Sequence, residues 1–149
     1  MKYLIILKGC PGSGKSTYAK RLSKKFFELY SVKSTICSAD DFFMVNGSYV
    51  YDPAKIGLAH MICFKKAAKA FESGTTLVII DNTNTKLRDY KKYIDAAVDY
   101  KIVIRTIGET TDEFIKLCCE RNIHSVPEET IKRMAKNLKD NLGANDGIY

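Results

Sequence analysis

A short glycine-rich stretch near the start of the chain constrains the fold more than any other feature. It reads Gly9-Cys10-Pro11-Gly12-Ser13-Gly14-Lys15-Ser16-Thr17 and matches the phosphate-binding pattern G-x-x-x-x-G-K-[ST] at every position. The apolar run 3–7 before it predicts a buried strand, and apolar residues at helical spacing after it predict a helix. The stretch therefore lies between a strand and a helix, as its mechanism requires.

The residue types in this stretch explain how it would bind a nucleotide. Glycines let the backbone wrap around an anion, so that amide N–H groups and the positive end of the next helix point at the phosphates. We expect Lys15 to bridge the β- and γ-phosphates and the Ser16 hydroxyl to coordinate Mg²⁺. A turn that merely reverses the chain is the alternative. The loop residues expected to bind ATP are Gly12, Ser13, Gly14, Lys15, Ser16 and Thr17.

The composition favours one globular domain with acidic partners. A chain of 149 residues can bury a sizeable core, and we expect 1–149 to form a single domain. The net charge of +7 favours nucleotides, nucleic acid or an anionic membrane surface as partners, although no apolar stretch is long enough to cross a membrane. Five cysteines without metal-ligand spacing indicate free thiols. We therefore expect a cytoplasmic location, with a nuclear one as the alternative.

Strand and helix patterns alternate along the rest of the chain. Further strands are predicted at 33–38, 76–81 and 101–107. Helices are predicted after the phosphate loop, at 54–72, at 86–99, from a capping box of Thr110 and Glu113 to about Arg121, and from Pro127 to near Gly143. Residues 42–53 are expected to form a loop. This order predicts a parallel α/β sheet with right-handed crossovers.

Two groups of carboxylates are expected beside the phosphate loop. Ligands of parallel sheets bind beyond the carboxyl ends of the strands, which is where Asp40, Asp41 and Asp81 fall. Asp81 closes an apolar strand, so we interpret it as a ligand of Mg²⁺, directly or through water, with a cap of the next turn as the alternative. One of Asp40 and Asp41 could orient an acceptor hydroxyl and take its proton. A helix cap or a solvated pair is the alternative for these two.

Four motifs, in this order, resemble those of one enzyme family. They are the phosphate loop, Ser38-Ala39-Asp40-Asp41-Phe42-Phe43, Asp81-Asn82-Thr83-Asn84-Thr85, and Arg121-Asn122 followed by Val126-Pro127 and 131–134. Together they resemble the kinase domain of phage-type 5′-hydroxyl polynucleotide kinases, and more closely that of the NEDD4-binding protein 2 group. The resemblance covers nearly the whole chain and implies a kinase-type P-loop NTPase fold, a three-layer αβα sandwich with a parallel sheet.

The resemblance also implies roles for individual residues. It makes Asp40 the general base, keeps Lys15 and Ser16 in their phosphate-loop roles, and makes Arg121 a lid residue that contacts the donor phosphates. The sequence supports the last role separately, because Arg121 continues the apolar helical face that begins at Phe114. A buried guanidinium needs a partner, so we expect a phosphate beside it, with a salt bridge at the core edge as the alternative.

One position departs from the resembling enzymes. Phe43 stands where the phage enzymes have an arginine that contacts the acceptor phosphate. Candidates for its replacement are Asn122, Arg88, Lys86 and Arg105. The aromatic residues of the expected loop 42–53 could stack on unpaired bases or form a small satellite core. They are Phe42, Phe43, Tyr49 and Tyr51.

These observations lead to one main hypothesis, a kinase that transfers the γ-phosphate of ATP to a hydroxyl, in particular the 5′-hydroxyl of DNA or RNA. In this hypothesis Mg²⁺ lies near Ser16 and Asp81, Lys15 and Arg121 stabilise the transferred group, and Asp40 accepts the proton. The same chemistry on a small metabolite or an aminoacylated RNA is one alternative. A nucleotide-binding interaction module without catalysis is the other.

Overall fold

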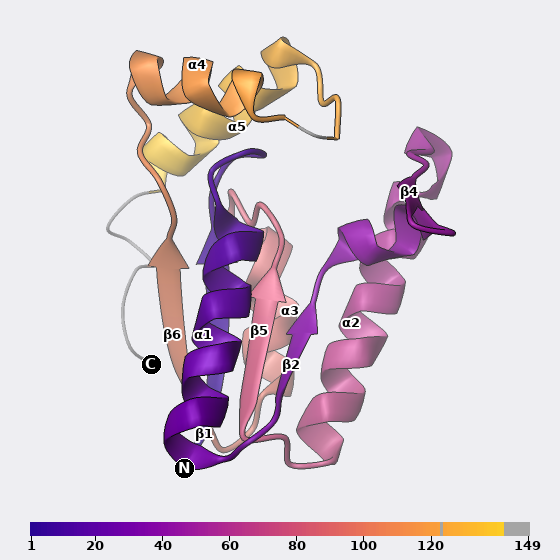
Figure 1. The fold of residues 1–149 in the computed structure, drawn as a ribbon, viewed down its shortest axis with the longest axis vertical. Helices are drawn as coiled ribbons and strands as arrows, with labels where there is room; N and C mark the ends of the chain where they lie inside the picture. Colours follow the sequence, from indigo (N-terminus) through magenta and orange to yellow (C-terminus); the bar gives the residue numbers. More distant parts are fainter. Residues whose placement is uncertain (123, 142–149) are drawn as a thin grey trace.

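The fold is built on a four-stranded parallel sheet (Figure 1). The computed structural model describes residues 1–122 and 124–141. The strand order is β2-β5-β1-β6, with β1 at Lys2–Lys8, β2 at Ser34–Cys37, β5 at Leu77–Asp81 and β6 at Tyr100–Thr106. Adjacent strands pair in parallel throughout this sheet. The predicted parallel α/β sheet is confirmed.

Helices cover both faces of the sheet. One face packs on α1 (Lys15–Tyr30), and the other packs on α2 (Ile56–Glu72) and α3 (Leu87–Ala96). The residues of β1 and β5 on the α1 side are Ile5, Leu7, Leu77 and Ile79. Those on the opposite side are Leu4, Ile6, Val78 and Ile80. Because side chains alternate along a strand, the apolar run of β5 is buried on both faces, and the predicted three-layer sandwich is confirmed.

Two further helices, α4 (Asp112–Glu120) and α5 (Glu128–Asp140), lie across the carboxyl ends of the strands (Figure 1). We call these two helices the lid. They form a separate small core with the phosphate loop, in which Cys10, Cys118 and Ile131 are almost fully buried. Since ligands of parallel sheets bind at this edge, the lid covers the expected binding site.

Residues 42–53 are more ordered than the expected loop. This region contains η1 (Ala39–Phe43), the hairpin strands β3 (Met44–Val45) and β4 (Ser48–Tyr49), and η2 (Pro53–Lys55). The hairpin turns at Asn46 and Gly47, which have φ angles of 50° and 80°. An Asn-Gly pair adopts such angles at little cost, so the signal for this turn was present in the sequence.

Several helix ends differ from their predicted positions. The N-cap of α4 is Thr111 rather than Thr110, because the Thr111 hydroxyl accepts the Phe114 amide N–H at 3.2 Å. Helix α3 ends at Ala96, three residues before the predicted 99. The predicted end of the last helix near Gly143 lies outside the described residues. Within 1–122 and 124–141, no helix combines the length and apolarity needed to cross a membrane.

Candidate active site

The phosphate loop joins the end of β1 to the first turn of α1, as predicted. Gly14 is the N-cap of α1 and has a φ of 99°, a left-handed conformation that residues with a Cβ rarely adopt. Gly12 has a φ of 80°, and a Cβ built there would lie 2.5 Å from the carbonyl oxygen of Cys118 in α4. Gly12 is therefore required both by the turn and by the close approach of the lid.

Lys15 lies at the centre of this loop and is 8% exposed. Its Nζ donates to the carbonyl oxygens of Gly9 and Cys10, at 2.9 Å each. Burial lowers the pKa of Lys15, and the nearby Asp81 carboxylate opposes that effect. An ammonium group in this position can exchange its two carbonyl acceptors for phosphate oxygens, which are stronger acceptors because they are charged.

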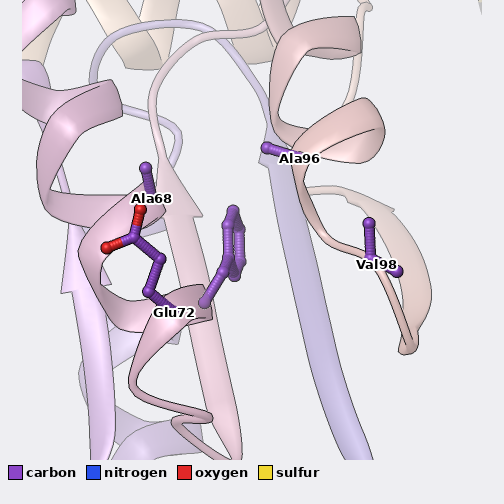
Figure 2. Close-up of a pocket in the computed structure, with 5 residues that line it drawn as sticks. Ala68, Glu72, Ala96 and Val98 are labelled. Atoms are coloured by element: carbon purple, nitrogen blue, oxygen red, sulfur yellow. The ribbon is translucent and has the colours of Figure 1, made fainter.

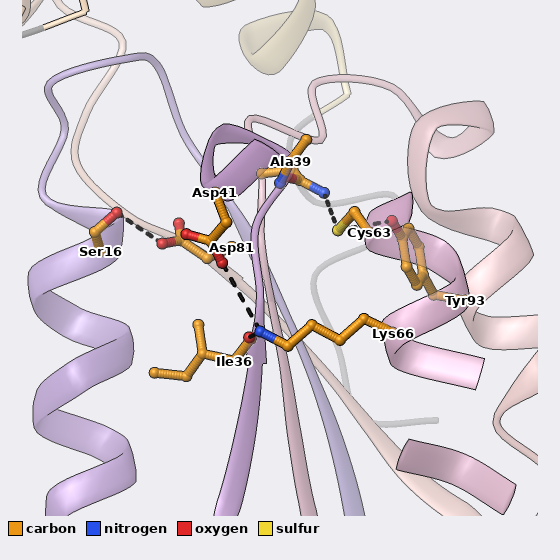
Figure 3. A network of polar contacts seen from close by, with 9 residues as sticks. Ser16, Ile36, Ala39, Asp41, Cys63, Lys66, Asp81 and Tyr93 are labelled. Atoms are coloured by element: carbon orange, nitrogen blue, oxygen red, sulfur yellow. Dashed lines mark hydrogen bonds and ion pairs between the residues drawn. The ribbon is translucent and has the colours of Figure 1, made fainter. Parts of the chain in front are cut away.

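Ser16 and Asp81 meet beside the phosphate loop (Figure 3). The Ser16 hydroxyl donates to Asp81 Oδ2 at 2.7 Å, and Asp81 is 6% exposed. Burial raises the pKa of Asp81, while the Ser16 hydrogen bond and Lys15 lower it. A hydroxyl and a carboxylate are hard oxygen donors of the kind that Mg²⁺ prefers, and Mg²⁺ takes its other ligands from phosphates and water. These two residues fit a nucleotide-bound Mg²⁺ ion.

The two adjacent aspartates at the end of β2 face different partners. Asp40 Oδ1 accepts the Tyr49 hydroxyl at 3.1 Å, and Asp40 Oδ2 lies 3.3 Å from Nδ1 of His124. Asp41 instead lies 3.8 Å from Nζ of Lys66, on α2 (Figure 3). The residue pattern left open which aspartate faces the phosphates, while the family resemblance favoured Asp40. Both aspartates raise the pKa of Asp81, but of the two it is Asp40 that also raises the pKa of Lys15, so Asp40 is the better candidate.

His124 was not identified from the sequence. It follows α4 in the chain, and its imidazole stacks on the Tyr49 ring. The two ring centroids are 4.0 Å apart and the ring planes differ by 11°. Both rings contact the Asp40 carboxylate, one through the Tyr49 hydroxyl and one through His124 Nδ1. Burial and Asp40 raise the pKa of Tyr49, so this hydroxyl remains a donor. One residue from the segment between the lid helices and one from the hairpin thus contact the two oxygens of one carboxylate.

Two asparagines in the segment after β5 form hydrogen bonds to the turn that carries Asp40 and to the end of β1. Asn82 Oδ1 accepts the amide N–H of Ala39 at 2.8 Å, directly before Asp40. Asn84 Nδ2 donates to the Leu7 carbonyl oxygen at 2.8 Å, close to the start of the phosphate loop. Both asparagines are buried, at 8% and 2% exposure. Their amide groups therefore fix the distance between the phosphate loop and the Asp40 turn.

Arg121 does not occupy the expected environment. Helix α4 ends at Glu120, and Arg121 is its exposed C-cap. The prediction of a buried guanidinium is wrong, because the buried face of α4 ends at Cys118 and the chain turns at Asn122, whose Nδ2 donates to the Val126 carbonyl oxygen. A contact between Arg121 and donor phosphates stays a prediction from the resemblance.

Phe43 belongs to the protein interior. It is 4% exposed and packs edge-on against Phe42 and Tyr49, with Tyr51 also in contact. Phe43 is part of the main core between the sheet and α2, with Phe42 and Tyr49 packed against it, so the expected small satellite core is wrong for this residue. An arginine that reaches an acceptor phosphate has no counterpart at this buried position.

A groove far from this site carries no candidate chemistry. It has a volume of about 300 Å³ and lies between the last turns of α2 and α3, at the amino ends of the strands (Figure 2). Its lining residues are Ala68, Phe71, Glu72, Ala96 and Val98. Glu72 is the one charged side chain in this lining, and within residues 1–122 and 124–141 no metal-binding cluster was found, so the groove offers neither a metal site nor an acid–base pair.

Comparison with known proteins shows the family to which this chain belongs. A family model described as an AAA domain matches residues 4–140, and the chain belongs to this family. NEDD4-binding protein 2 of Homo sapiens is 35% identical over 138 residues, which are 91% of this chain and 8% of that protein. The chain therefore spans less than a tenth of the length of that relative.

Solved structures show the same kinase-type P-loop fold. The structure of the Pnkp1/Rnl/Hen1 RNA repair complex matches with a TM-score of 0.70 and 25% identity, over 97% of this chain and 46% of the matched chain. Kti12 of Chaetomium thermophilum, in complex with ADP-AlF3, matches with a TM-score of 0.54 and 18% identity, over 92% of this chain and 78% of that one. The second match concerns the fold alone. The resemblance to polynucleotide kinase domains is thus confirmed at the level of family and fold.

Proposed function

We propose that this protein is an ATP-dependent kinase that phosphorylates the 5′-hydroxyl of a DNA or RNA strand. The observation that carries the proposal is the carboxylate of Asp40, held by Tyr49 and His124 within electrostatic range of Lys15 and Asp81. Asp40 is a second carboxylate besides the candidate metal ligand Asp81. A general base of this kind serves a hydroxyl acceptor and is not needed for nucleotide binding alone. The similarity to a chain of an RNA repair complex supports a nucleic-acid acceptor.

The reaction would proceed by in-line transfer. The acceptor oxygen attacks the γ-phosphorus of ATP, the bond from that phosphorus to the β,γ-bridging oxygen breaks, and ADP leaves. Asp40 accepts the proton of the acceptor hydroxyl. Lys15 stabilises charge on the phosphates, and Arg121 would contact them from the lid. Mg²⁺ held by Ser16 and Asp81 would neutralise developing charge when it is bound.

A direct transfer assay tests this function. The protein is incubated with Mg²⁺ and γ-labelled ATP, together with single-stranded DNA and RNA that carry either a 5′-hydroxyl or a 5′-phosphate. We expect label on the 5′-hydroxyl strands alone, and none with Lys15→Ala, because that variant lacks the ammonium group at the γ-phosphate. If ATP binds and neither strand is labelled, the proposal is wrong, and small-molecule acceptors become the next candidates.

The metal site gives a second prediction. Asp81→Asn removes the charge from the carboxylate that Ser16 contacts, so we expect the Mg²⁺ concentration for half-maximal transfer to rise by about tenfold or more. Activity is titrated with MgCl₂ at saturating ATP. Asp95→Asn, on the exposed end of α3, is the control and should not change the midpoint. An unchanged midpoint in Asp81→Asn would remove Asp81 from the metal site.

A further inference from the structure

A large cleft lies beside the candidate active site. It has a volume of about 810 Å³ and is bounded by α2, the segment between β5 and α3, the first turns of α3, and α5. Its lining residues are His60, Thr83, Asn84, Thr85, Lys86, Arg88, Asp89, Lys92, Arg133, Met134 and Asn137. Polar and cationic side chains therefore dominate this cleft.

The charge of the cleft is strongly positive. Lys86, Arg88, Lys92 and Arg133 line it, against one carboxylate, Asp89. Asp89 Oδ2 already accepts the amide N–H of Lys86 at 3.0 Å, and Asp89 Oδ1 lies 3.9 Å from Nε of Arg88. Among the described residues, no carboxylate lies within ion-pair distance of Lys86, Lys92 or Arg133. This excess of cationic side chains favours the binding of a ligand with several negative charges.

The wall of the cleft is continuous with the phosphate loop. The Thr83 carbonyl oxygen accepts the amide N–H of Gly9 at 3.0 Å, so a cleft residue contacts the first residue of the loop. On the other side, partial desolvation and Lys92 lower the pKa of His60, while Asp89 and Asp40 raise it. His60 therefore lies within electrostatic range of the candidate base, so the cleft is close to Asp40 as well as to the phosphate loop.

We propose that this cleft binds the internucleotide phosphates of a single-stranded acceptor, downstream of the nucleoside that carries the 5′-hydroxyl. The proposal rests on the proposed function and adds the residues that select a polynucleotide over a small acceptor. Cations from two separate helices, Arg88 on α3 and Arg133 on α5, suit a ligand whose charges are spread along a chain. Because Phe43 is buried, phosphate contacts on the acceptor have to come from elsewhere, and this cleft supplies them.

A binding measurement independent of catalysis tests the cleft. The anisotropy of a 5′-hydroxyl DNA hexanucleotide with a 3′-fluorescein is measured against wild type, Arg88→Gln/Arg133→Gln, and the charge-matched control Lys65→Gln/Lys136→Gln. The control lysines are exposed and lie outside the cleft. We expect the cleft variant to raise Kd about tenfold or more above the control. The slope of log Kd against log salt should fall by about 1.4, or about 0.7 for each lost phosphate contact.

The outcomes separate this proposal from the proposed function. Equal Kd values for the two double variants would overturn the cleft as a strand site, whether or not the hexanucleotide is phosphorylated. Displacement by a nucleoside 3′-monophosphate as readily as by unlabelled hexanucleotide would also overturn it, since a cleft that spans several phosphates must prefer the longer ligand. Cleft-dependent binding without 5′ labelling would support the cleft and overturn the kinase assignment alone.

Discussion

Asp40→Asn is expected to lower kcat for 5′-hydroxyl phosphorylation by about 10²- to 10⁴-fold, the usual contribution of a positioned general base. Asparagine has nearly the same shape, so the contacts with Tyr49 and His124 can be retained while the group that accepts the proton is lost. The Kd for MgATP should stay within about twofold, because the phosphate loop is unchanged. Single-turnover transfer and nucleotide binding are measured on the same protein.

The neighbouring aspartate is a matched control. Asp41→Asn removes the same charge one residue away, but the Asp41 side chain is 66% exposed and pairs with Lys66 on the outside of α2. We expect its kcat to stay within about twofold of wild type, since an exposed ion pair contributes little. Equal losses in the two variants would mean that the net charge at the end of β2 matters, and Asp40 would no longer be the base. Full activity in Asp40→Asn would also exclude that role.

The parts of the site that the sequence predicted are those that depend on local structure. A phosphate loop needs only a strand, a turn and a helix that are adjacent in the chain, and the structure has them in that order. The meeting of Ser16 with Asp81 follows from one further rule, that parallel strands end at the same edge of a sheet. The pairing of β1 with β5 brings these two residues together.

The contacts of Asp40 could not be derived in this way. His124 reaches Asp40 across 84 positions in the sequence, and it does so because the lid packs on the phosphate loop through Cys10 and Cys118. The direction of that packing depends on shape complementarity between side chains, which no periodic pattern encodes. Tyr49 was visible as a loop aromatic, but its hydroxyl reaches Asp40 only through the β3–β4 hairpin.

The two asparagines after β5 illustrate the same limit. They were part of the motif that suggested the family, yet their physical role was hidden. Asn82 and Asn84 each use a buried side-chain amide to satisfy a backbone group from another segment, at Ala39 and at Leu7. An unsatisfied buried backbone group costs about 1–3 kcal/mol, so these positions are constrained by the assembled fold. The two asparagines therefore affect the site by setting the spacing between the end of β1 and the turn that carries Asp40.

Lys15→Met is expected to remove the stabilisation that bound nucleotide gives, while the free energy of unfolding of the nucleotide-free protein changes little. The substitution keeps most of the apolar stem but removes the buried ammonium. Two effects on the free energy of unfolding then oppose each other. The protein no longer has to bury a charge whose pKa burial already lowers, while the Gly9 and Cys10 carbonyl oxygens lose their donor. We therefore expect the nucleotide-free variant to lie within about 2 kcal/mol of wild type.

The response to MgATP should differ sharply between the two proteins. At a concentration of about 100 times Kd, the ligand stabilises wild type by about 2.7 kcal/mol, which corresponds to a rise in Tm of about 5–11 °C for a domain of this size. Lys15→Met should show almost none of this rise, because the ammonium group supplies the contact with the β- and γ-phosphates. Differential scanning fluorimetry with and without MgATP measures both quantities.

Lys20→Met provides the control for this comparison, since Lys20 is exposed on the same helix. It should keep the full rise in Tm with MgATP. If Lys15→Met kept it as well, the bonds from Lys15 Nζ to the Gly9 and Cys10 carbonyl oxygens would be the working arrangement of this side chain, and it would hold the loop in shape instead of binding phosphate. If the rise were lost only in Lys15→Met, those two bonds would be the ones exchanged for phosphate oxygens when the nucleotide binds.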